Sequence, residues 1–164
     1  MNPLAQELVT LGHIRSPRVT EAFKHIDRAD FVPESMKSYA YLNEPLAIGH
    51  GQTISQPSTV AFLLELLETK EGEKILDIGS GTGWQTALLA HCVTHDEYGY
   101  RLQRDHSRNG RVYGVEVVPE LFRLGIKNFA KYGFMNTGAV SIYCMNARKG
   151  LPEKAPFDKI IAAA

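Results

Sequence analysis

The chain has 164 residues, of which 44% are apolar and 22% are charged, as is typical of a soluble globular protein of one domain. Lysine and arginine together number 18, as do aspartate and glutamate, so the formal net charge of zero argues against electrostatic capture of nucleic acid or of a membrane surface. The sequence has no run of 18 apolar residues and no basic-then-apolar leader, so we expect no transmembrane helix, no signal peptide and a cytoplasmic location.

The first third of the chain is expected to be mainly helical. Residues 2–12 contain spaced leucines typical of a short helix. Ser16-Pro17 then resembles a helix N-terminus, in which the serine caps and the proline takes the first helical position. Apolar residues recur at i, i+3, i+4 and i+7 over residues 19–26, which indicates one face of a second helix. Over residues 39–48 the apolar side chains stand among turn-forming residues, and we expect a loop there.

Residues 49–57 read Gly-His-Gly-Gln-Thr-Ile-Ser-Gln-Pro and are rich in small and hydroxyl side chains. This composition, without a run of charges, argues against a linker. An amphipathic helix is expected directly afterwards and should end near Lys70. Ser55 or Ser58 could serve only as the N-cap of that helix, which is the alternative to a functional role for Ser55.

The next stretch is the most informative one. A short apolar run over residues 75–78 leads into Gly79, Gly81 and Gly83, and a helical pattern follows from Trp84. Strand, tight glycine turn and helix in this order are typical of a nucleotide-binding βαβ unit. Glycine is expected there because the turn requires unusual backbone angles and because a Cβ atom would keep the main chain away from a ligand.

The glycine spacing distinguishes between cofactors. Gly79, Gly81 and Gly83 form Gly-x-Gly-x-Gly with Asp77 two residues before it, and not the dinucleotide pattern, which argues against a nicotinamide dehydrogenase. The arrangement resembles the S-adenosylmethionine (SAM) loop of class I methyltransferases. SAM carries an ammonium group and no phosphate, so a nearby carboxylate offers a charge-assisted hydrogen bond. The alternative is an ordinary glycine-rich turn with a solvated or capping Asp77.

Residues 91–110 are polar and carry both charges, which favours a solvated excursion; an insert that contacts the substrate is the other interpretation. The β-branched run over residues 111–116 predicts a second strand. Its last residue, Glu116, stands where this architecture places a carboxylate against ribose hydroxyls, unless it is simply an exposed glutamate at a strand end. A helix from Pro119 and further strands over 140–144 and 157–163 complete a βαβαββ order. This order predicts an α/β fold with a doubly wound, mostly parallel sheet.

The cysteines and histidines give no sign of a metal site. Cys92 and Cys144 are far apart in the sequence and lack a Cys-x-x-Cys spacing, so we expect two buried free thiols. His91 and His95 are spaced to share a helix face, but no third ligand accompanies them. We therefore expect no metal site.

Several blocks of the chain resemble a known family, the protein-L-isoaspartate O-methyltransferases. The resemblance covers most of the chain from about residue 15, and the second and fourth blocks are the most specific to the family. It implies one Rossmann-like methyltransferase domain over 1–164, with a helical substrate segment over 1–70 and the core over 71–164. The blocks are Phe31-Val-Pro-Glu34, Gly51-Gln-Thr-Ile-Ser-Gln-Pro57, Ile75-Leu-Asp-Ile-Gly-Ser-Gly-Thr-Gly83, Gly150-Leu-Pro-Glu-Lys-Ala-Pro-Phe-Asp158 and, more weakly, Val112-Tyr-Gly-Val-Glu-Val-Val-Pro-Glu-Leu121.

The resemblance implies transfer of a methyl group from SAM to the α-carboxylate of L-isoaspartyl residues in damaged proteins, a repair reaction that leaves S-adenosyl-L-homocysteine as product. The acceptor carboxylate is already ionised, so the main task is to hold the two partners in line and no strong base is needed. Ser55 matches the family's active-site serine, which orients the carboxylate. The cofactor-binding residues implied by the match are Gln52, Thr53, Ile54, Ser55, Asp77, Gly79, Gly81, Gly83 and Glu116, with Asn146 and Ala147 near the adenine.

Two departures from the family pattern affect these expectations. Where the family has Gly-Asp-Gly, this chain has Met145, Asn146 and Ala147, so we expect weaker or altered adenine binding. The family also continues past the fourth strand, so we expect the C-terminal strands to be missing and a sheet edge to be uncovered unless a partner such as a second copy covers it. Both departures leave open a non-catalytic relative that binds cofactor or peptide. Another class I methyltransferase with a different acceptor is a weaker alternative.

Overall fold

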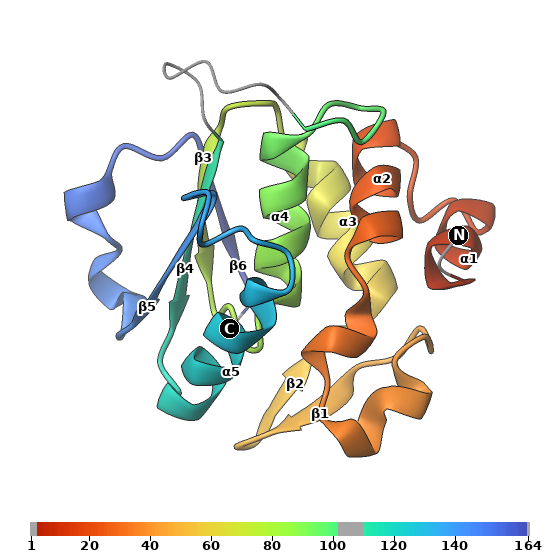
Figure 1. The fold of residues 1–164 in the computed structure, drawn as a ribbon, viewed down its shortest axis with the longest axis horizontal. Coiled ribbons are helices and arrows are strands. Elements are labelled where there is room, and N and C mark those ends of the chain that lie inside the picture. Colours follow the sequence, from red (N-terminus) through yellow and green to blue (C-terminus); the bar gives the residue numbers. More distant parts are fainter. Residues whose placement is uncertain (1–2, 102–109, 164) are drawn as a thin grey trace.

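The computed structural model describes residues 3–101 and 110–163 and is built around one parallel sheet (Figure 1). The strand order is β5-β4-β3-β6, and each neighbouring pair is parallel. The predicted α/β class with a parallel sheet is therefore confirmed. The strands are β3 (Lys74–Ile78), β4 (Arg111–Glu116), β5 (Val140–Cys144) and β6 (Lys159–Ala162).

Helices cover one face of this sheet. The helix of residues 84–94 connects β3 to β4, and the helix of residues 119–130 connects β4 to β5, so both connections proceed in the same direction across the sheet. Because such connections are right-handed, the two helices lie on the same face. The first of the two is buried along nearly its whole length, because the N-terminal helices pack over it (Figure 1). The helices are α1 (Pro3–Thr10), α2 (Pro17–His25), α3 (Pro57–Leu67), α4 (Trp84–Thr94) and α5 (Pro119–Ala130).

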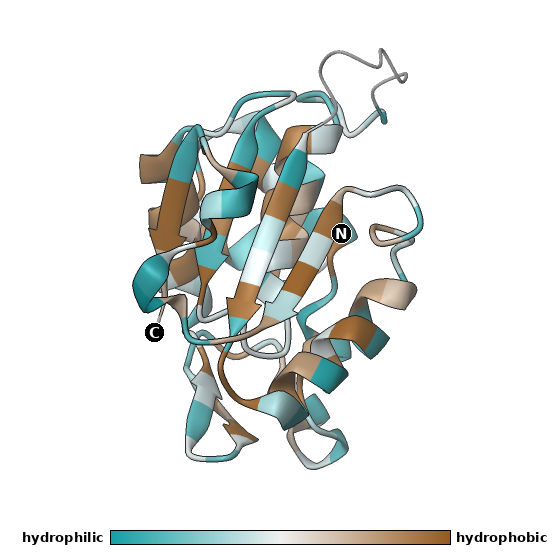
Figure 2. Ribbon diagram, turned by 90° about the vertical axis from the view of Figure 1, so that its left-hand side faces the viewer, coloured by the Kyte–Doolittle hydropathy of each residue, from teal (hydrophilic) through white to brown (hydrophobic). Residues whose placement is uncertain are grey.

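The return connection from β5 to β6 covers the opposite face. It contains only two short 3-10 turns, η3 (Ala147–Lys149) and η4 (Pro152–Lys154). Leu151 between them packs onto the side chains of Leu76 and Tyr113 from the sheet. Figure 2 looks onto this face, where brown apolar segments of the strands lie beside teal polar ones. One face of the sheet is therefore covered by α-helices, and the other face is covered only by the connection between β5 and β6.

The expectation of a loop over residues 39–48 is wrong for residues 46–48, which belong to a strand. The structure has an antiparallel hairpin of β1 (Leu46–Gly49) and β2 (Gln52–Ile54), preceded by the 3-10 turns η1 (Arg28–Phe31) and η2 (Glu34–Tyr39). Leu46 and Ile48 are buried while the residues between and after them are exposed, which is the alternation of a strand. Two apolar positions in a four-residue strand were too few to reveal this period from the sequence.

Of the two thiols that we expected to be buried, only that of Cys92 is buried. Cys92 lies in α4 and is buried, and burial raises the pKa of its thiol to about 12. Cys144 is exposed, because it is the last residue of β5, the edge strand of the sheet. The polar excursion expected from residue 91 also begins later, since α4 continues to Thr94; residues 102–109 of that stretch lie outside the described part of the chain.

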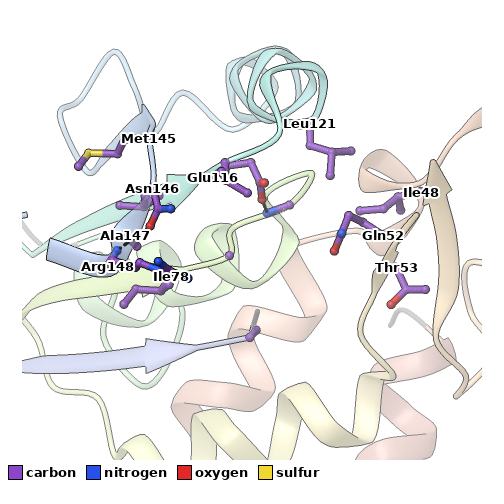
Figure 3. Close-up of a pocket in the computed structure, with 15 residues that line it drawn as sticks. Ile48, Gln52, Thr53, Ile78, Glu116, Leu121, Met145, Asn146, Ala147 and Arg148 are labelled. Atoms are coloured by element: carbon purple, nitrogen blue, oxygen red, sulfur yellow. Dashed lines mark hydrogen bonds between the residues drawn. The ribbon is translucent and has the colours of Figure 1, made fainter. Parts of the chain in front are cut away.

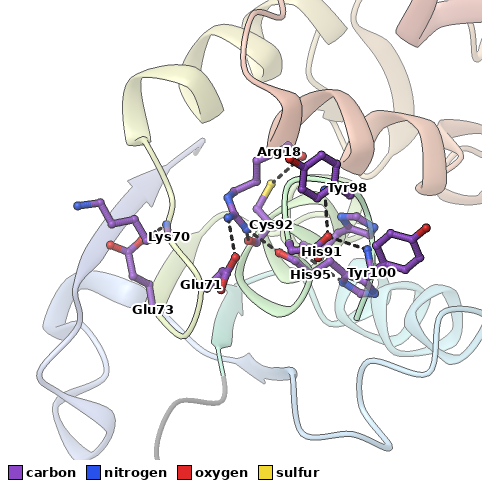
Figure 4. Close-up of polar contacts among 10 residues, drawn as sticks. Arg18, Lys70, Glu71, Glu73, His91, Cys92, His95, Tyr98 and Tyr100 are labelled. Atoms are coloured by element: carbon purple, nitrogen blue, oxygen red, sulfur yellow. Dashed lines mark hydrogen bonds and ion pairs between the residues drawn. The ribbon is translucent and has the colours of Figure 1, made fainter. Parts of the chain in front are cut away.

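Figure 4 shows how the far end of α4 is held. Arg18 of α2 donates from Nη1 to the carbonyl oxygens of Cys92 and His95, at 2.7 and 2.6 Å, and from Nη2 to Glu71 Oε1 at 3.1 Å. A cation at a helix C-terminus satisfies carbonyls that have no partner within the helix. The rings of His91 and His95 stack with centroids 4.1 Å apart. Within residues 3–101 and 110–163, no group of three or more histidine, cysteine or acidic side chains is placed to hold a metal ion.

Over the same described ranges, no helix has both the length and the apolar character that a membrane crossing requires.

Candidate functional site

A cleft of about 510 Å³ opens at the carboxyl ends of β3, β4, β5 and β6. In open parallel sheets, ligands bind in the crevice outside these strand ends. Figure 3 shows Ile48, Gln52 and Thr53 of the β1–β2 hairpin on one side of the cleft, the turn of residues 145–148 on the opposite side, and Glu116 between them. The cleft therefore joins a part of the chain before the sheet to the ends of all four of its strands.

The glycine turn after β3 forms part of the cleft wall. Gly79 and Gly81 both line the cleft and both have a positive φ, +82° and +55°, a conformation that favours glycine. The backbone N–H groups of Gly79 and Ser80 donate to the carbonyl oxygen of Val115, at 2.9 and 3.1 Å. These bonds fix the turn against the end of β4, so the main chain itself faces the cleft.

Gly83 has a different place. It is the N-cap of α4, with φ at +98°, and it lines neither the cleft nor the smaller cavity beside it. A Cβ atom added there would lie 2.5 Å from Cζ of Phe129 in α5. Glycine at this position thus allows α5 to pack closely against the turn.

Asp77 lies behind the cleft wall. Its side chain is fully buried and accepts hydrogen bonds from Gln85 Nε2, at 2.9 Å, and from the hydroxyl of Thr86, both in α4. Burial raises the pKa of Asp77 to about 6, and the two hydrogen bonds act in the opposite direction. The interpretation of Asp77 as a solvated side chain is therefore wrong. Asp77 also lines neither cavity.

Glu116 faces the cleft at the end of β4 and is only 5% exposed, so the exposed strand-end glutamate considered from the sequence is wrong. Its Oε2 accepts from the backbone N–H of Gly81 at 2.7 Å, and its Oε1 accepts from that of Val118 at 2.8 Å. Each carboxylate oxygen has a second lone pair. The side chain is thus held in place with acceptor capacity left for a ligand.

The segment of residues 52–55 runs along both cavities. Gln52 and Thr53 line the large cleft, whereas Ile54 and Ser55 line a second cavity of about 40 Å³. The capping role considered for Ser55 and Ser58 is wrong. The N-cap of α3 is Gln56, without a side-chain cap, and the free backbone N–H of Ser58 donates to Oδ1 of Asn43 at 2.9 Å.

Arg28 holds this segment, and the sequence analysis missed it. Its guanidinium is fully buried and lies 5.1 Å from the ring centre of Trp84; burial lowers its pKa to about 10. No sequence pattern marks the residue, because its partners are backbone atoms 12 to 27 residues away. The guanidinium donates to four carbonyl oxygens at 2.9–3.1 Å, those of Ala40, Leu42, Glu44 and Ser55.

The turn after β5 forms the far side of the cleft. Met145, Asn146 and Ala147 line it, as does Arg148, which the sequence analysis did not single out. Oδ1 of Asn146 accepts from the backbone N–H of Arg148 at 3.0 Å and caps η3. The side-chain amide NH₂ of Asn146 is therefore the part that remains available to a ligand.

Taken together, the structure gathers most of the residues singled out from the sequence. Asp77 and Gly83 stand apart, as they line neither cavity. The larger cleft takes Gln52, Thr53, Gly79, Gly81, Glu116, Asn146 and Ala147, and the smaller cavity takes Thr53, Ile54, Ser55, Gly79 and Gly81.

Comparison with solved structures shows the same fold. A protein-L-isoaspartate O-methyltransferase aligns with a TM-score of 0.79 and 27% identity, over 98% of this chain and 46% of that one. A putative protein-L-isoaspartate O-methyltransferase from Plasmodium falciparum, in complex with S-adenosyl-L-homocysteine, aligns with a TM-score of 0.81 and 25% identity, over 99% and 72% of the two chains.

Sequence relatives agree with this. The protein-L-isoaspartate O-methyltransferases of Aeropyrum pernix and Staphylothermus marinus are each 41% identical, over 98% and 94% of this chain. The chain spans 56% and 64% of the length of these two relatives. The family model described as Protein-L-isoaspartate(D-aspartate) O-methyltransferase (PCMT) matches residues 1–164. The chain therefore belongs to the protein-L-isoaspartate O-methyltransferase family.

Proposed function

We propose that the chain carries the donor site and part of the acceptor site of a SAM-dependent methyltransferase that acts on L-isoaspartyl residues of damaged proteins. The observation that carries the proposal is that residues 53–55 lie beside the glycine turn of residues 79–81. Both segments line the small cavity, which shares Thr53, Gly79 and Gly81 with the large cleft. Family membership supports the same function.

The residues of the cleft fit SAM. Glu116 has acceptor capacity free for two ribose hydroxyls, and the turn of Gly79 and Gly81 leaves the main chain open to the ligand. Asn146 and Ala147 stand at the opposite end, where the adenine would lie. The altered adenine binding expected from Met145-Asn146-Ala147 stays a prediction.

When bound, SAM supplies a methyl group on a sulfonium, which a carboxylate oxygen takes as the carbon–sulfur bond breaks and its electron pair stays on sulfur. Ser55 donates a hydrogen bond that orients the isoaspartyl carboxylate. Gln52, Thr53 and Ile54 cover the donor, and the buried Ile48 and Ile54 exclude water from the hairpin side. The protein contributes mainly by alignment, because neither reactant needs a proton removed.

Replacement of Ser55 by alanine should lower kcat for an isoaspartyl peptide by about tenfold to a hundredfold, the value of one hydrogen bond to a charged group. Affinity for S-adenosyl-L-homocysteine should fall less than kcat does, because Ser55 also lines the small cavity beside the donor site but its hydrogen bond goes to the acceptor carboxylate. The measurement is transfer of labelled methyl to an isoaspartyl peptide and to its aspartyl twin, with Ser58→Ala as the matched control.

An unchanged kcat in Ser55→Ala would refute the role of Ser55. Equal methylation of the two peptides would refute isoaspartyl specificity. If the chain binds S-adenosyl-L-homocysteine but methylates neither peptide, it is the binding module considered as the alternative.

Replacement of Glu116 by glutamine should weaken binding of S-adenosyl-L-homocysteine by about tenfold or more. The amide has one acceptor oxygen, so its NH₂ group must face either Gly81 N–H or Val118 N–H, and the ribose loses an acceptor. Calorimetric titration measures the change. Glu120→Gln is the matched control, because Glu120 pairs with Arg123 on the surface and lines neither cavity. Equal affinity of Glu116→Gln and wild type would contradict the assignment.

We also propose one methyltransferase domain over residues 1–164, since one buried cluster contains side chains from both the 1–70 and the 71–164 segments. A cytoplasmic location and self-association through the edge of the sheet stay predictions.

A further inference from the structure

Three histidine rings stack on one another at the end of α4 that lies away from the cleft (Figure 4). His91 is the central ring. Its centroid lies 5.0 Å from that of His25, the last residue of α2, and 4.1 Å from that of His95, with interplanar angles of 20° and 2°. The stack therefore joins the last turn of α2 to the last turn of α4, and it lines neither the cleft nor the small cavity.

The two outer rings are held as neutral donors. Nδ1 of His25 lies 2.9 Å from the carbonyl oxygen of Glu21, and Nδ1 of His95 lies 3.3 Å from the carbonyl oxygen of His91. A carbonyl oxygen can only accept, so Nδ1 of each outer ring carries the proton and donates it. The Nε2 atom of each outer ring is thus the one that would take up a second proton.

The central ring has no place for a charge. His91 is 3% exposed, and its Nε2 is buried without a hydrogen-bond partner within the described residues. An imidazolium has an N–H group on both nitrogens, so a protonated His91 would bury an unpaired donor. Burial lowers the pKa of His91 from 6.5 to about 3, and the two outer rings and the Arg18 guanidinium act in the same direction.

The turn of residues 95–101 rests on this stack. A Cβ atom added to Gly99 would lie 3.1 Å from both Glu21 Oε2 and His25 Cε1, so the main chain of the turn packs directly against the last turn of α2. The side chain of Asp96 closes the turn by accepting from two of its backbone N–H groups, each at 2.9 Å. The turn is thus one hydrogen-bonded unit that meets α2 at an outer ring of the stack.

The surrounding charges favour a proton on an outer ring over one on the central ring. Glu21 Oε2 lies 3.8 Å from His25 Nδ1, so a charge on that outer ring has a counter-charge beside it. The Nε2 atom of the central ring has neither an acid nor any other partner among the residues that the structure describes. The charged groups that neighbour the stack are Arg18, Glu21 and Lys24 of α2, Glu71 before β3, and Asp96 and Arg101 of the turn.

We propose that the three stacked histidines form an acid-sensitive latch, which holds the 95–101 turn against α2 and α4 while all three rings are neutral and releases it when they take up protons. Charge on an outer ring is placed 4.1–5.0 Å from the centre of the next ring, where a second charge would be repelled. Opening the latch separates the rings and gives the central Nε2 access to water. Protons therefore favour the open form.

The direction of the pH dependence follows from the central ring. Its pKa in the closed form, about 3, lies below the value of 6.5 that it regains when exposed, so the open form binds the proton more tightly. The latch is fully stable above pH 6.5 and weakens as the pH falls from 6.5 towards 3. Linkage of one proton raises the opening constant about tenfold for each pH unit in this window.

The test is amide hydrogen exchange followed by NMR on the intact chain between pH 6.5 and 4.5. The reporter amides are those of His95, Asp96 and Gly99, which donate to backbone oxygens at 2.9–3.1 Å. After correction for the intrinsic exchange rate, their opening constant should rise about tenfold per pH unit. The amide of Val112, which donates to Ala139 in the sheet at 2.8 Å, is the internal control and should change by less than about threefold over the whole range.

His91→Phe keeps a flat ring in the stack but cannot take up a proton, so the dependence should flatten to about threefold or less per pH unit, the remainder coming from the outer rings. His91→Leu is a second variant in case phenylalanine is too large for the site. His13→Phe is the matched control, because His13 is exposed and lies outside the stack, and it should keep the wild-type slope.

Two results would overturn the latch. One is a wild-type opening constant at the turn that does not change with pH, or that changes equally in wild type and in both His91 variants. The other is an opening constant of the Val112 amide that rises in step with that of the turn, because acid would then unfold the whole domain and not release one segment.

Discussion

Arg28→Met should lower the free energy of unfolding by about 3–5 kcal/mol, because four carbonyl oxygens lose their hydrogen bonds to one charged donor. Methionine keeps much of the side-chain length, but it has no donor for the carbonyl oxygens of residues 40, 42, 44 and 55. The Ala40 oxygen would remain buried and unpaired, and the three part-buried oxygens would each lose a charged donor. Urea denaturation followed by circular dichroism measures the change.

Arg15→Met is the matched control for this experiment. Arg15 is exposed and its side chain donates from Nε to one carbonyl, that of Gly12 at 3.2 Å, so the loss should stay within about 0.5 kcal/mol. Arg28→Lys keeps the charge but has one nitrogen for four carbonyls, and it should fall between the two. A loss below about 1 kcal/mol in Arg28→Met would show that the contacts do not support the segment.

Gly83→Ala should lower the free energy of unfolding by about 2–4 kcal/mol, for two reasons that add. The φ angle of +98° disfavours any residue with a Cβ atom, and that atom would lie 2.5 Å from the ring of Phe129. The ring must move, which disturbs the contact of α5 with the turn. Thermal and chemical unfolding measure the loss.

Gly133→Ala separates the cost of the backbone conformation from the cost of the clash with Phe129. Gly133 has a φ of +66°, but a Cβ atom there would meet nothing within 4 Å, so Gly133→Ala carries the backbone cost alone, about 1–2 kcal/mol. Combining Gly83→Ala with Phe129→Leu should recover part of the difference, because leucine leaves room for the methyl group. Equal losses in Gly83→Ala and Gly133→Ala would contradict the clash.

Features encoded by neighbouring residues were predictable from the sequence. The strand, glycine turn and helix over residues 74–94 follow from an apolar run and glycine spacing, and the structure has them there. Glu116 was placed at the strand end for the same reason, since parallel strands end on one edge of the sheet. The sheet order and the cleft follow once these elements are assigned.

Features that depend on distant partners were not predictable. The N-terminus of α3 is capped by Asn43 and not by its own serines, because the 40–44 loop is brought alongside it. Gly83 could be singled out from the spacing of the motif, but its packing against Phe129, which comes 46 residues later, has no local signal. Arg28 carries no sequence signal, as main-chain carbonyls exist at every position and only the fold selects which ones meet.

Trp84 is the only tryptophan of the chain; its ring centre lies 5.1 Å from the Arg28 guanidinium, and the residue lines the small cavity. Its indole emission therefore comes from one known place, beside a fixed cation and a cavity next to the proposed donor site. The native protein thus contains an intrinsic optical probe for ligand titrations, and no label needs to be introduced.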